Sequence, residues 1–323
     1  MVLRFVVDPN VFNFVNNEEI QSASHLRLMS LWEKLGVLSL SSCHHEMDDY
    51  LRGLPQQIKK AWQVALTTER YRKCDSLNTK LVDMMTSCEL LMSNSSLIDV
   101  AFLEETRAAR FGVNDGELCT VVEDGVELTR FDCCDQSRKF QELAQLWERP
   151  VTISESREQV WETRFRAIAT YSRRISIVDR YSLLHLHSRH QSGEVSGLEI
   201  FLRKLSRCAG GPKKTVNVYG SSKDVKESDA ENTLRRVTSG MNSGSIASLH
   251  LHVCRDRIFS KVAHDRYIRF DGVATAMGAG VSLFQNEPIR ENYLLGLMVD
   301  RSDLLKNNIE EELRRSSTRY KII

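Results

Sequence analysis

The sequence contains no apolar run long enough to cross a membrane and no recognisable export signal. No window of the 323 residues approaches 18 apolar positions, so we expect no membrane span. The opening segment MVLRFVVDPNVF has no basic stretch followed by a long apolar run, so we also expect no signal peptide. Proline (5 residues) and glycine (16 residues) are scarce, which favours long regular elements over loops.

The cysteines lack the spacing of a metal or redox site. The eight cysteines include no CxxC pair, and Cys133 and Cys134 are adjacent, which disfavours a bridge between them. Without an export signal, we expect reduced thiols and a cytoplasmic protein. The run CHHE at 43–46 does not predict a zinc site, because adjacent side chains seldom converge on one ion. GGPKKT at 210–215 lacks the spacing of a phosphate-binding P-loop.

Neither sign of charge is in excess. Lysine and arginine together number 44, aspartate and glutamate 43, so the total charge neither favours nor excludes nucleic acid. The chain is 41% apolar and 27% charged, which is typical of a globular protein. The chain is longer than a single hydrophobic core usually supports, which predicts two domains.

Short apolar runs alternate with amphipathic segments along the chain. We expect strands at 3–7, 37–42 and 118–125, with helices at 25–36, 58–92 and 93–112 between them. After Pro150, a helix at 156–174 leads to a second series of strands, at 175–181, 214–222, 249–256 and 264–272, and to a final helix at 302–323. The sequence therefore predicts an α/β protein with domains at 1–135 and 173–323, joined by a helical connector at 136–172.

Acidic residues stand at the expected ends of several N-terminal elements. Asp8 follows the first strand, Glu46 the second, and Asp99 opens the expected helix, while Glu123 and Asp124 end the third strand. Converging carboxylates repel one another unless a cation neutralises them, and Mg²⁺ or Mn²⁺ prefers oxygen ligands. Such ions can activate water to attack a phosphodiester. The alternative is that these acids only cap turns and helices.

This arrangement resembles the PIN-domain ribonucleases over about residues 1–130. VVDPNVF is similar to the first acidic motif of that family, LSSCHHEMDDYL to its strand-and-Glu motif, and SSLIDVAFLEETRAARFG with LCTVVEDG to its last two acids. The resemblance implies a parallel-sheet sandwich and a metal-dependent nuclease, with RNA favoured over DNA as its substrate and with Mg²⁺ or Mn²⁺ held by Asp8, Glu46, Asp99 and Asp124. The family places Ser or Thr shortly before one final Asp. Here Glu123 and Asp124 stand instead.

The segment HDRYIRFD at 264–271 is the main motif of the second half. In a strand, its alternation directs His264 and Arg266 to one face and Asp271 to the other. His264 and Arg266 could therefore meet one phosphate, or they could be two polar residues on a solvated sheet face.

This segment resembles the phospholipase D signature HxKx4D, with Arg in place of Lys. GAGVS at 278–282 is similar to the Gly-Ser turn of that signature, and ISIVDRY to the opening strand of such domains. The chain is similar to prokaryotic phospholipase-D-like domains with an HDR core and to the C-terminal domain of MIT-domain proteins, over about 170–300. The resemblance implies a phosphate site at His264, Arg266 and Ser282, with Asp271 completing the signature.

The phospholipase D mechanism needs two such motifs, and this chain has one. A homodimer would supply two copies of His264. Three interpretations remain open: a metal-dependent nuclease with a phosphate-binding or dimerising second domain, a non-catalytic phosphate- or partner-binding scaffold, and a metal-independent dimeric phosphodiesterase using His264 as nucleophile. By analogy with the company that such domains keep in bacteria, the first implies a toxin or phage-defence effector.

Overall fold

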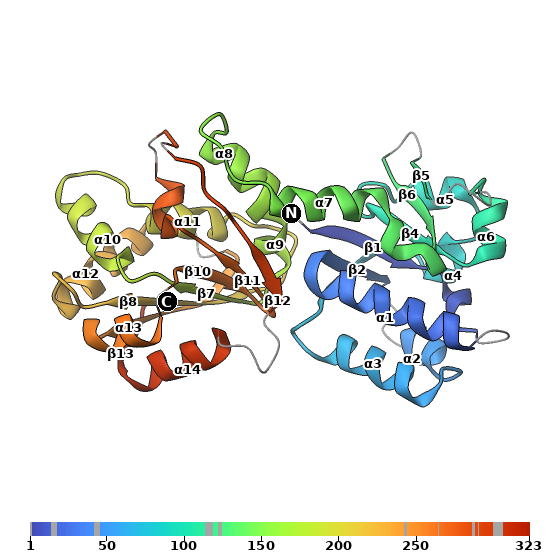
Figure 1. The fold of residues 1–323 in the computed structure, drawn as a ribbon, viewed down its shortest axis with the longest axis horizontal. Coiled ribbons are helices and arrows are strands. Elements are labelled where there is room, and N and C mark those ends of the chain that lie inside the picture. The colour runs from blue at the N-terminus through green and yellow to red at the C-terminus, as the bar shows by residue number, and fades with distance from the viewer. Residues whose placement is uncertain are drawn as a thin grey trace. The chain divides into compact units, whose positions relative to one another are not determined.

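The computed structural model describes residues 2–13, 18–41, 46–113, 119–121, 125–241, 244–263, 265–285, 288–289, 291–299 and 306–323. The chain divides into two compact units, called here the N-terminal domain (Val2–Gln145) and the C-terminal domain (Leu146–Ile323). Helix α7 (Arg138–Glu148) spans this boundary. Both domains are α/β, which confirms the expected fold class (Figure 1). No helix among the described residues is long and apolar enough to span a membrane.

The N-terminal domain is built on five parallel strands with an antiparallel sixth strand at one edge. The strand order is β3-β2-β1-β4-β6-β5. The strands are β1 (Leu3–Val7), β2 (Gly36–Ser41), β3 (Arg72–Leu77), β4 (Val100–Leu103), β5 (Cys119–Val121) and β6 (Glu127–Arg130). The order reverses between β1 and β4, and open α/β sheets bind ligands at such a switch point, beyond the carboxyl ends of the strands.

The helices of this domain lie between successive strands along the chain and after the last one. They are η1 (Pro9–Phe12), α1 (Glu18–Leu35), α2 (Glu46–Leu51), α3 (Gln56–Thr67), α4 (Leu81–Met84), α5 (Cys88–Met92), α6 (Glu105–Arg110) and η2 (Phe131–Gln136). Phe5 of β1 packs edge-on against Trp32 of α1, with ring centroids 5.9 Å apart, and against Phe140 of α7 at 6.3 Å. Helices α1 and α7 therefore cover the same face of the sheet.

Two of the helix predictions for this domain are wrong. The segment predicted as one helix over 58–92 contains the strand β3, and the helix predicted over 93–112 contains β4. Ala101 and Phe102 have helical spacing relative to Ile98, but Val100–Leu103 is also a wholly buried apolar run. Pairing with β1 on one side and β6 on the other makes this run a central strand.

The C-terminal domain has a seven-stranded mixed sheet in the order β12-β11-β10-β7-β8-β9-β13. Strands β7, β8 and β9 are parallel, and the other neighbours are antiparallel. The strands are β7 (Arg174–Val178), β8 (Lys214–Ser221), β9 (Ile246–Cys254), β10 (Tyr267–Phe270), β11 (Val273–Ala276), β12 (Leu297–Val299) and β13 (Ser317–Lys321). The helices are α8 (Arg157–Val160), the π-helical η3 (Trp161–Phe165), α9 (Arg166–Tyr171), α10 (Ser182–Gln191), α11 (Gly197–Ser206), α12 (Glu227–Ser239), α13 (Asp256–Val262), η4 (Gly280–Phe284) and α14 (Lys306–Arg315).

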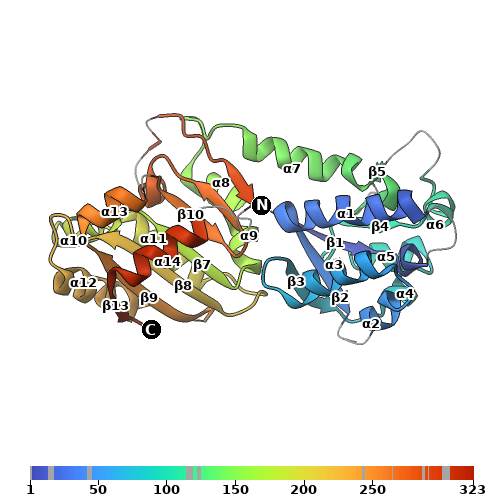
Figure 2. The same cartoon turned by 60° about the horizontal axis from the view of Figure 1, so that its bottom comes forward.

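Helix α14 lies across one face of this sheet (Figure 2). Its Glu310 is fully buried and accepts hydrogen bonds from Arg269 of β10, at 2.7 Å from Nε, and from Ser176 of β7, also at 2.7 Å. The helix predicted over 302–323 is too long. Helix α14 ends at Arg315, and Ser317–Lys321 form the strand β13, which pairs with β9. The strand predicted over 264–272 is also too long. The observed strand β10 covers only Tyr267–Phe270, so Arg266 lies just before it.

Candidate functional site

Asp8 lies at the switch point of the N-terminal sheet. It follows β1, and its backbone N–H donates to Phe102 O of the neighbouring β4 at 2.9 Å. Its side chain is fully buried and accepts hydrogen bonds from the N–H groups of Asn10 (3.0 Å) and Glu104 (3.2 Å). Arg107 of α6 adds an ion pair, with Nε 2.7 Å from Oδ2. Burial raises the pKa of Asp8, and Arg107 opposes that shift.

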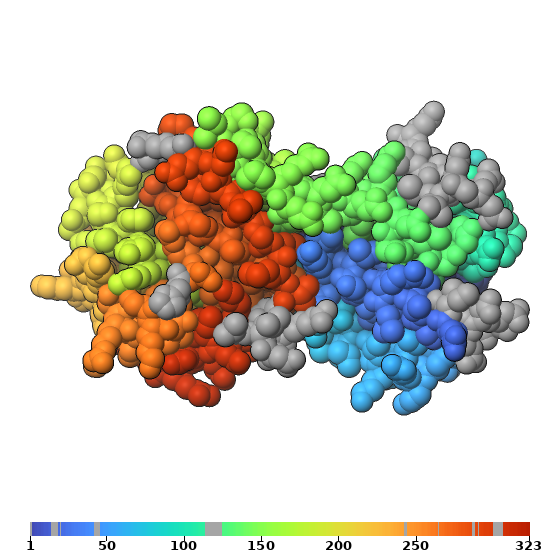
Figure 3. Space-filling model, in the orientation of Figure 1, coloured from blue at the N-terminus to red at the C-terminus, as the bar shows by residue number. Residues whose placement is uncertain are grey.

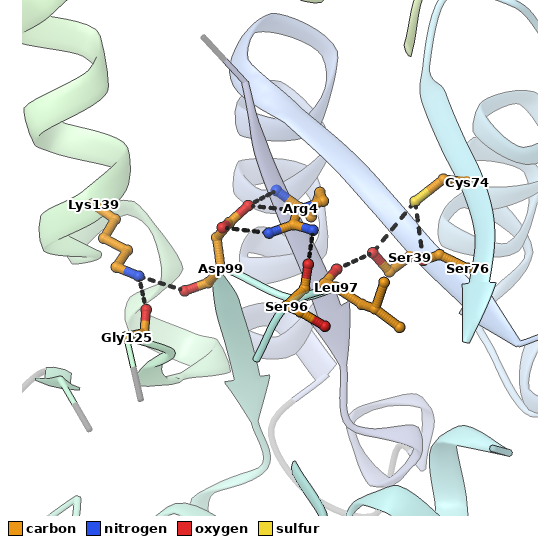
Figure 4. A network of polar contacts seen from close by, with 9 residues as sticks. All are labelled: Arg4, Ser39, Cys74, Ser76, Ser96, Leu97, Asp99, Gly125 and Lys139. Carbon is orange, nitrogen blue, oxygen red and sulfur yellow. Dashed lines mark hydrogen bonds and ion pairs between the residues drawn. The ribbon is translucent and has the colours of Figure 1, made fainter. Parts of the chain in front are cut away.

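Asp99 lies at the other end of the same strands. It precedes β4, and its carboxylate accepts three hydrogen bonds from Arg4: one from the backbone N–H at 2.7 Å, and one each from Nε and Nη2 at 3.0 Å. Lys139 Nζ donates to the backbone oxygen of Asp99 at 3.1 Å (Figure 4). Four residues of strand, about 13 Å, separate Arg4 from Asp8. The expected convergence of Asp99 with Asp8 is therefore wrong.

Glu46 begins α2 and lines a pocket of about 180 Å³. Its carboxylate accepts hydrogen bonds from Ser41 Oγ at 2.7 Å and from Tyr50 Oη at 2.5 Å. Lys73 and Leu81 are among the other residues that line this pocket, and Asp8 is not. The two short hydrogen bonds of Glu46 thus come from hydroxyl groups.

The predicted metal ligands do not fit one ion in the described part of the chain. Glu123 and Asp124 lie outside the described residues, as does His264. Among the residues described, no group of three or more His, Cys, Asp or Glu side chains is placed to hold a metal. Asp8 already has a cationic partner in Arg107, and Asp99 has one in Arg4. Of the predicted ligands that the structure describes, Asp8 and Asp99 therefore lie at opposite ends of the strands and do not share one ion.

Arg266 lies at the carboxyl edge of the C-terminal sheet. Tyr267 pairs with Val178, the last residue of β7, so Arg266 stands next to the chain segment that leaves β7. Its guanidinium carbon lies 5.9 Å from the ring centroid of Tyr181, a cation–π distance. Among the described residues, no carboxylate forms an ion pair with Arg266.

The neighbouring Arg180 is engaged within the protein. Its Nε and Nη2 contact the two carboxylate oxygens of Asp256 at 2.8 and 2.7 Å, and Ser221 Oγ donates to the same carboxylate at 2.7 Å. These contacts, that of Arg180 first, lower the pKa of Asp256 to about 2. The guanidinium of Arg180 also lies 5.5 Å from the Tyr181 ring. Of the two arginines beside Tyr181, Arg266 is the one without an ion pair to a described residue.

A turn formed by GAGVS is held against the end of β7 by Asp179. Its buried carboxylate accepts hydrogen bonds from the N–H groups of Val281 at 2.9 Å and Tyr181 at 3.0 Å. Gly280 has φ +61, and a Cβ there would stand 2.1 Å from Asp179 Oδ2. The predicted site did not include Asp179 or Tyr181, although the motif ISIVDRY shows a strand ending in an acid.

Asp271 and Ser282 have roles inside the fold. Asp271 lies in the two-residue turn between β10 and β11 with φ +52, and it accepts hydrogen bonds from the N–H groups of Arg173 (3.0 Å) and Arg174 (2.8 Å). Five residues, about 17 Å of extended chain, separate it from Arg266, so the two side chains lie apart, as expected for residues on opposite faces of a strand. Ser282 Oγ donates to Ala279 O within the turn.

Comparison with known proteins adds no relative. No known protein-family model matches this chain, and no curated protein matches it. The function must therefore be argued from the geometry of the residues themselves.

Proposed function

We propose that this protein binds RNA through a phosphate contact at the carboxyl edge of its C-terminal sheet, with Arg266 as the anchor. The observation that supports it is the contrast between the two arginines beside Tyr181. Asp256 neutralises Arg180, while Arg266 is half-buried and has no ion pair with a described residue. A guanidinium can bind two phosphate oxygens at once, which makes Arg well suited to this contact.

The position of Arg266 supports the same proposal. Parallel strands in α/β sheets bring their ligands to their carboxyl ends, and Arg266 stands beside the end of β7. The turn at Gly280 packs on Asp179 directly beside it. The sequence resemblance also implies a phosphate site at this motif. The proposal requires no metal, in keeping with the arrangement of the acids in the N-terminal domain.

Binding of a labelled single-stranded RNA tests this proposal, with DNA of the same sequence as comparison. We expect Arg266→Gln to weaken RNA binding about tenfold, because a charge-assisted contact is lost. Arg173→Gln is the matched control: this exposed arginine lies at the opposite edge of the same sheet, and its replacement should change the affinity less than about twofold. Equal losses in the two variants would mean that Arg266 contributes only general charge.

Metal-dependent RNA cleavage by the N-terminal domain is a second candidate. Asp8 stands at the topological switch point, where such sheets bind ligands, and Glu104 follows the neighbouring strand. Incubation of RNA with Mn²⁺ and with EDTA, using Asp8→Asn and His264→Ala, separates the mechanisms. Cleavage that needs Mn²⁺ and Asp8 supports this candidate. Cleavage that survives EDTA and is lost in His264→Ala instead supports a phosphohistidine mechanism, which would require a homodimer.

A further inference from the structure

Two hollows on the C-terminal domain meet at one ion pair. The first, of about 300 Å³, is lined by residues of α8, η3, α9 and the end of α11. The second, of about 510 Å³, is lined by residues 153–158, by α11 and by residues 284, 285, 288 and 289. Glu158 and Lys204, which form an ion pair, line both hollows. Figure 3 shows the surface where the green segment carrying α8 meets the orange-red segment that includes η4.

The first hollow is cationic. Three basic residues, Arg166, Lys204 and Arg207, surround it together with the carboxylates of Glu158 and Glu162. Both carboxylates are engaged, since Glu158 pairs with Lys204 and Glu162 with Arg166 at 2.7 Å. Arg207 is exposed and forms no ion pair with a described residue. It therefore offers a positive charge that the protein itself does not neutralise.

The second hollow is mainly apolar. Its lining includes Ile153, Ile200, Phe284 and Ile289, and Ile153 is 65% exposed. An apolar side chain that is this accessible within a concave surface can gain from burial against a ligand. The two hollows thus present adjacent cationic and apolar surfaces.

We propose that the two hollows form one binding site for a small amphipathic carboxylate. The anionic head contacts Arg207 in the first hollow, and the apolar body lies over Ile153 and Ile200 in the second. Lys204, which lines both hollows, marks the point where head and body join. The combined space is in the range of sites for small organic ligands, which are commonly about 300–1,000 Å³. This site is independent of Arg266 and of RNA binding.

Titration of the full-length protein with decanoate, followed by calorimetry, tests this proposal. Decanol has the apolar body without the charge, and butyrate has the charge with little apolar surface. We expect saturable binding of decanoate, and binding of both comparison compounds about tenfold weaker or more. Arg207→Gln should weaken decanoate binding about tenfold, and Ile153→Ser about fivefold.

Arg236→Gln is the matched control, because Arg236 is exposed on α12 and lines neither hollow. It should leave the affinity for decanoate unchanged. Equal binding of decanol and decanoate would overturn the proposal, because the charged hollow would then contribute nothing. The same conclusion follows if Arg207→Gln behaves like Arg236→Gln, or if decanoate gives no saturable heat. Both substitutions in the hollows are at exposed positions, so the variants should fold.

Discussion

Nε of Arg107 lies 2.7 Å from Oδ2 of Asp8, so the acid at the end of β1 is neutralised by a side chain of α6. Asp8 is fully buried, and the Arg107 side chain is 14% exposed. This ion pair explains how a buried carboxylate is stable at the switch point of the sheet. It also links the end of β1 to helix α6, which follows β4.

Removal of Arg107 should destabilise the N-terminal domain. In Arg107→Met, Asp8 would remain buried without its cationic partner, at a cost of about 3 kcal/mol in the free energy of unfolding at neutral pH. Denaturant unfolding measures this loss. Adding Asp8→Asn should recover much of it, because no uncompensated charge then remains. The pair would not be a main source of stability if Arg107→Met unfolds like the native chain.

Asp99→Asn should affect stability and leave any metal-dependent cleavage unchanged. Its carboxylate accepts three hydrogen bonds from Arg4 at the edge opposite Asp8. Because both side chains are about a quarter exposed, we expect a loss of only about 1 kcal/mol. Thermal unfolding and an RNA cleavage assay with Mn²⁺ check the two parts. A loss of cleavage with unchanged stability would assign Asp99 to catalysis.

The position of Asp8 could be predicted from the sequence, and that of Asp99 could not. The apolar run at 3–7 followed by Asp-Pro is a local signal for a buried strand and a turn. Val100–Leu103 is apolar but also fits helical spacing, and only its pairing with β1 and β6 decides between the two. With the helix taken in place of the strand, Asp99 was expected at the wrong edge.

In the C-terminal domain, too, local sequence patterns do not reveal which strands pair. Strands β7, β8 and β9 followed from local pattern, whereas β11, β12 and β13 were not predicted. The contact of Arg266 with Tyr181 depends on the pairing of β10 with β7. Asp271 is followed by Gly272, a common sequence for a two-residue hairpin turn, and this local signal explains its position better than the phosphate motif does. Turn chemistry would thus have separated Asp271 from Arg266 in advance.

Gly280→Ala should disturb the edge that carries Arg266. A Cβ at Gly280 would stand 2.1 Å from Asp179 Oδ2, so the Asp179 carboxylate or the turn must move. We expect a loss of about 3 kcal/mol in unfolding free energy, with weaker RNA binding. Gly210→Ala is the control, since Gly210 also has positive φ (+82) but open space around it. That variant should lose only about 1 kcal/mol. Equal losses would mean that backbone strain alone matters.

The N-terminal domain should lose stability as the pH falls from about 6.5 to 4, because of His25. This side chain is fully buried, and its Nδ1 accepts a hydrogen bond from Trp62 Nε1 at 3.0 Å. Burial lowers the pKa of His25 to about 4. Between pH 4 and 6.5 the unfolded chain therefore binds a proton that the folded chain does not, so stability falls with pH. This difference in pKa lowers the free energy of unfolding by about 3 kcal/mol at pH 4, relative to neutral pH.

Native-state hydrogen exchange of the α1 amides, converted to opening free energies at pH 4.5 and 7, measures this effect in the domain that contains His25. In His25→Gln, the side-chain oxygen can still accept from Trp62 but does not titrate, so the difference between the two pH values should shrink by about 2 kcal/mol or more. An unchanged difference would show that other groups cause the acid sensitivity. A stability that rises on acidification would contradict the neutral, buried state of His25 that its contact with Trp62 requires.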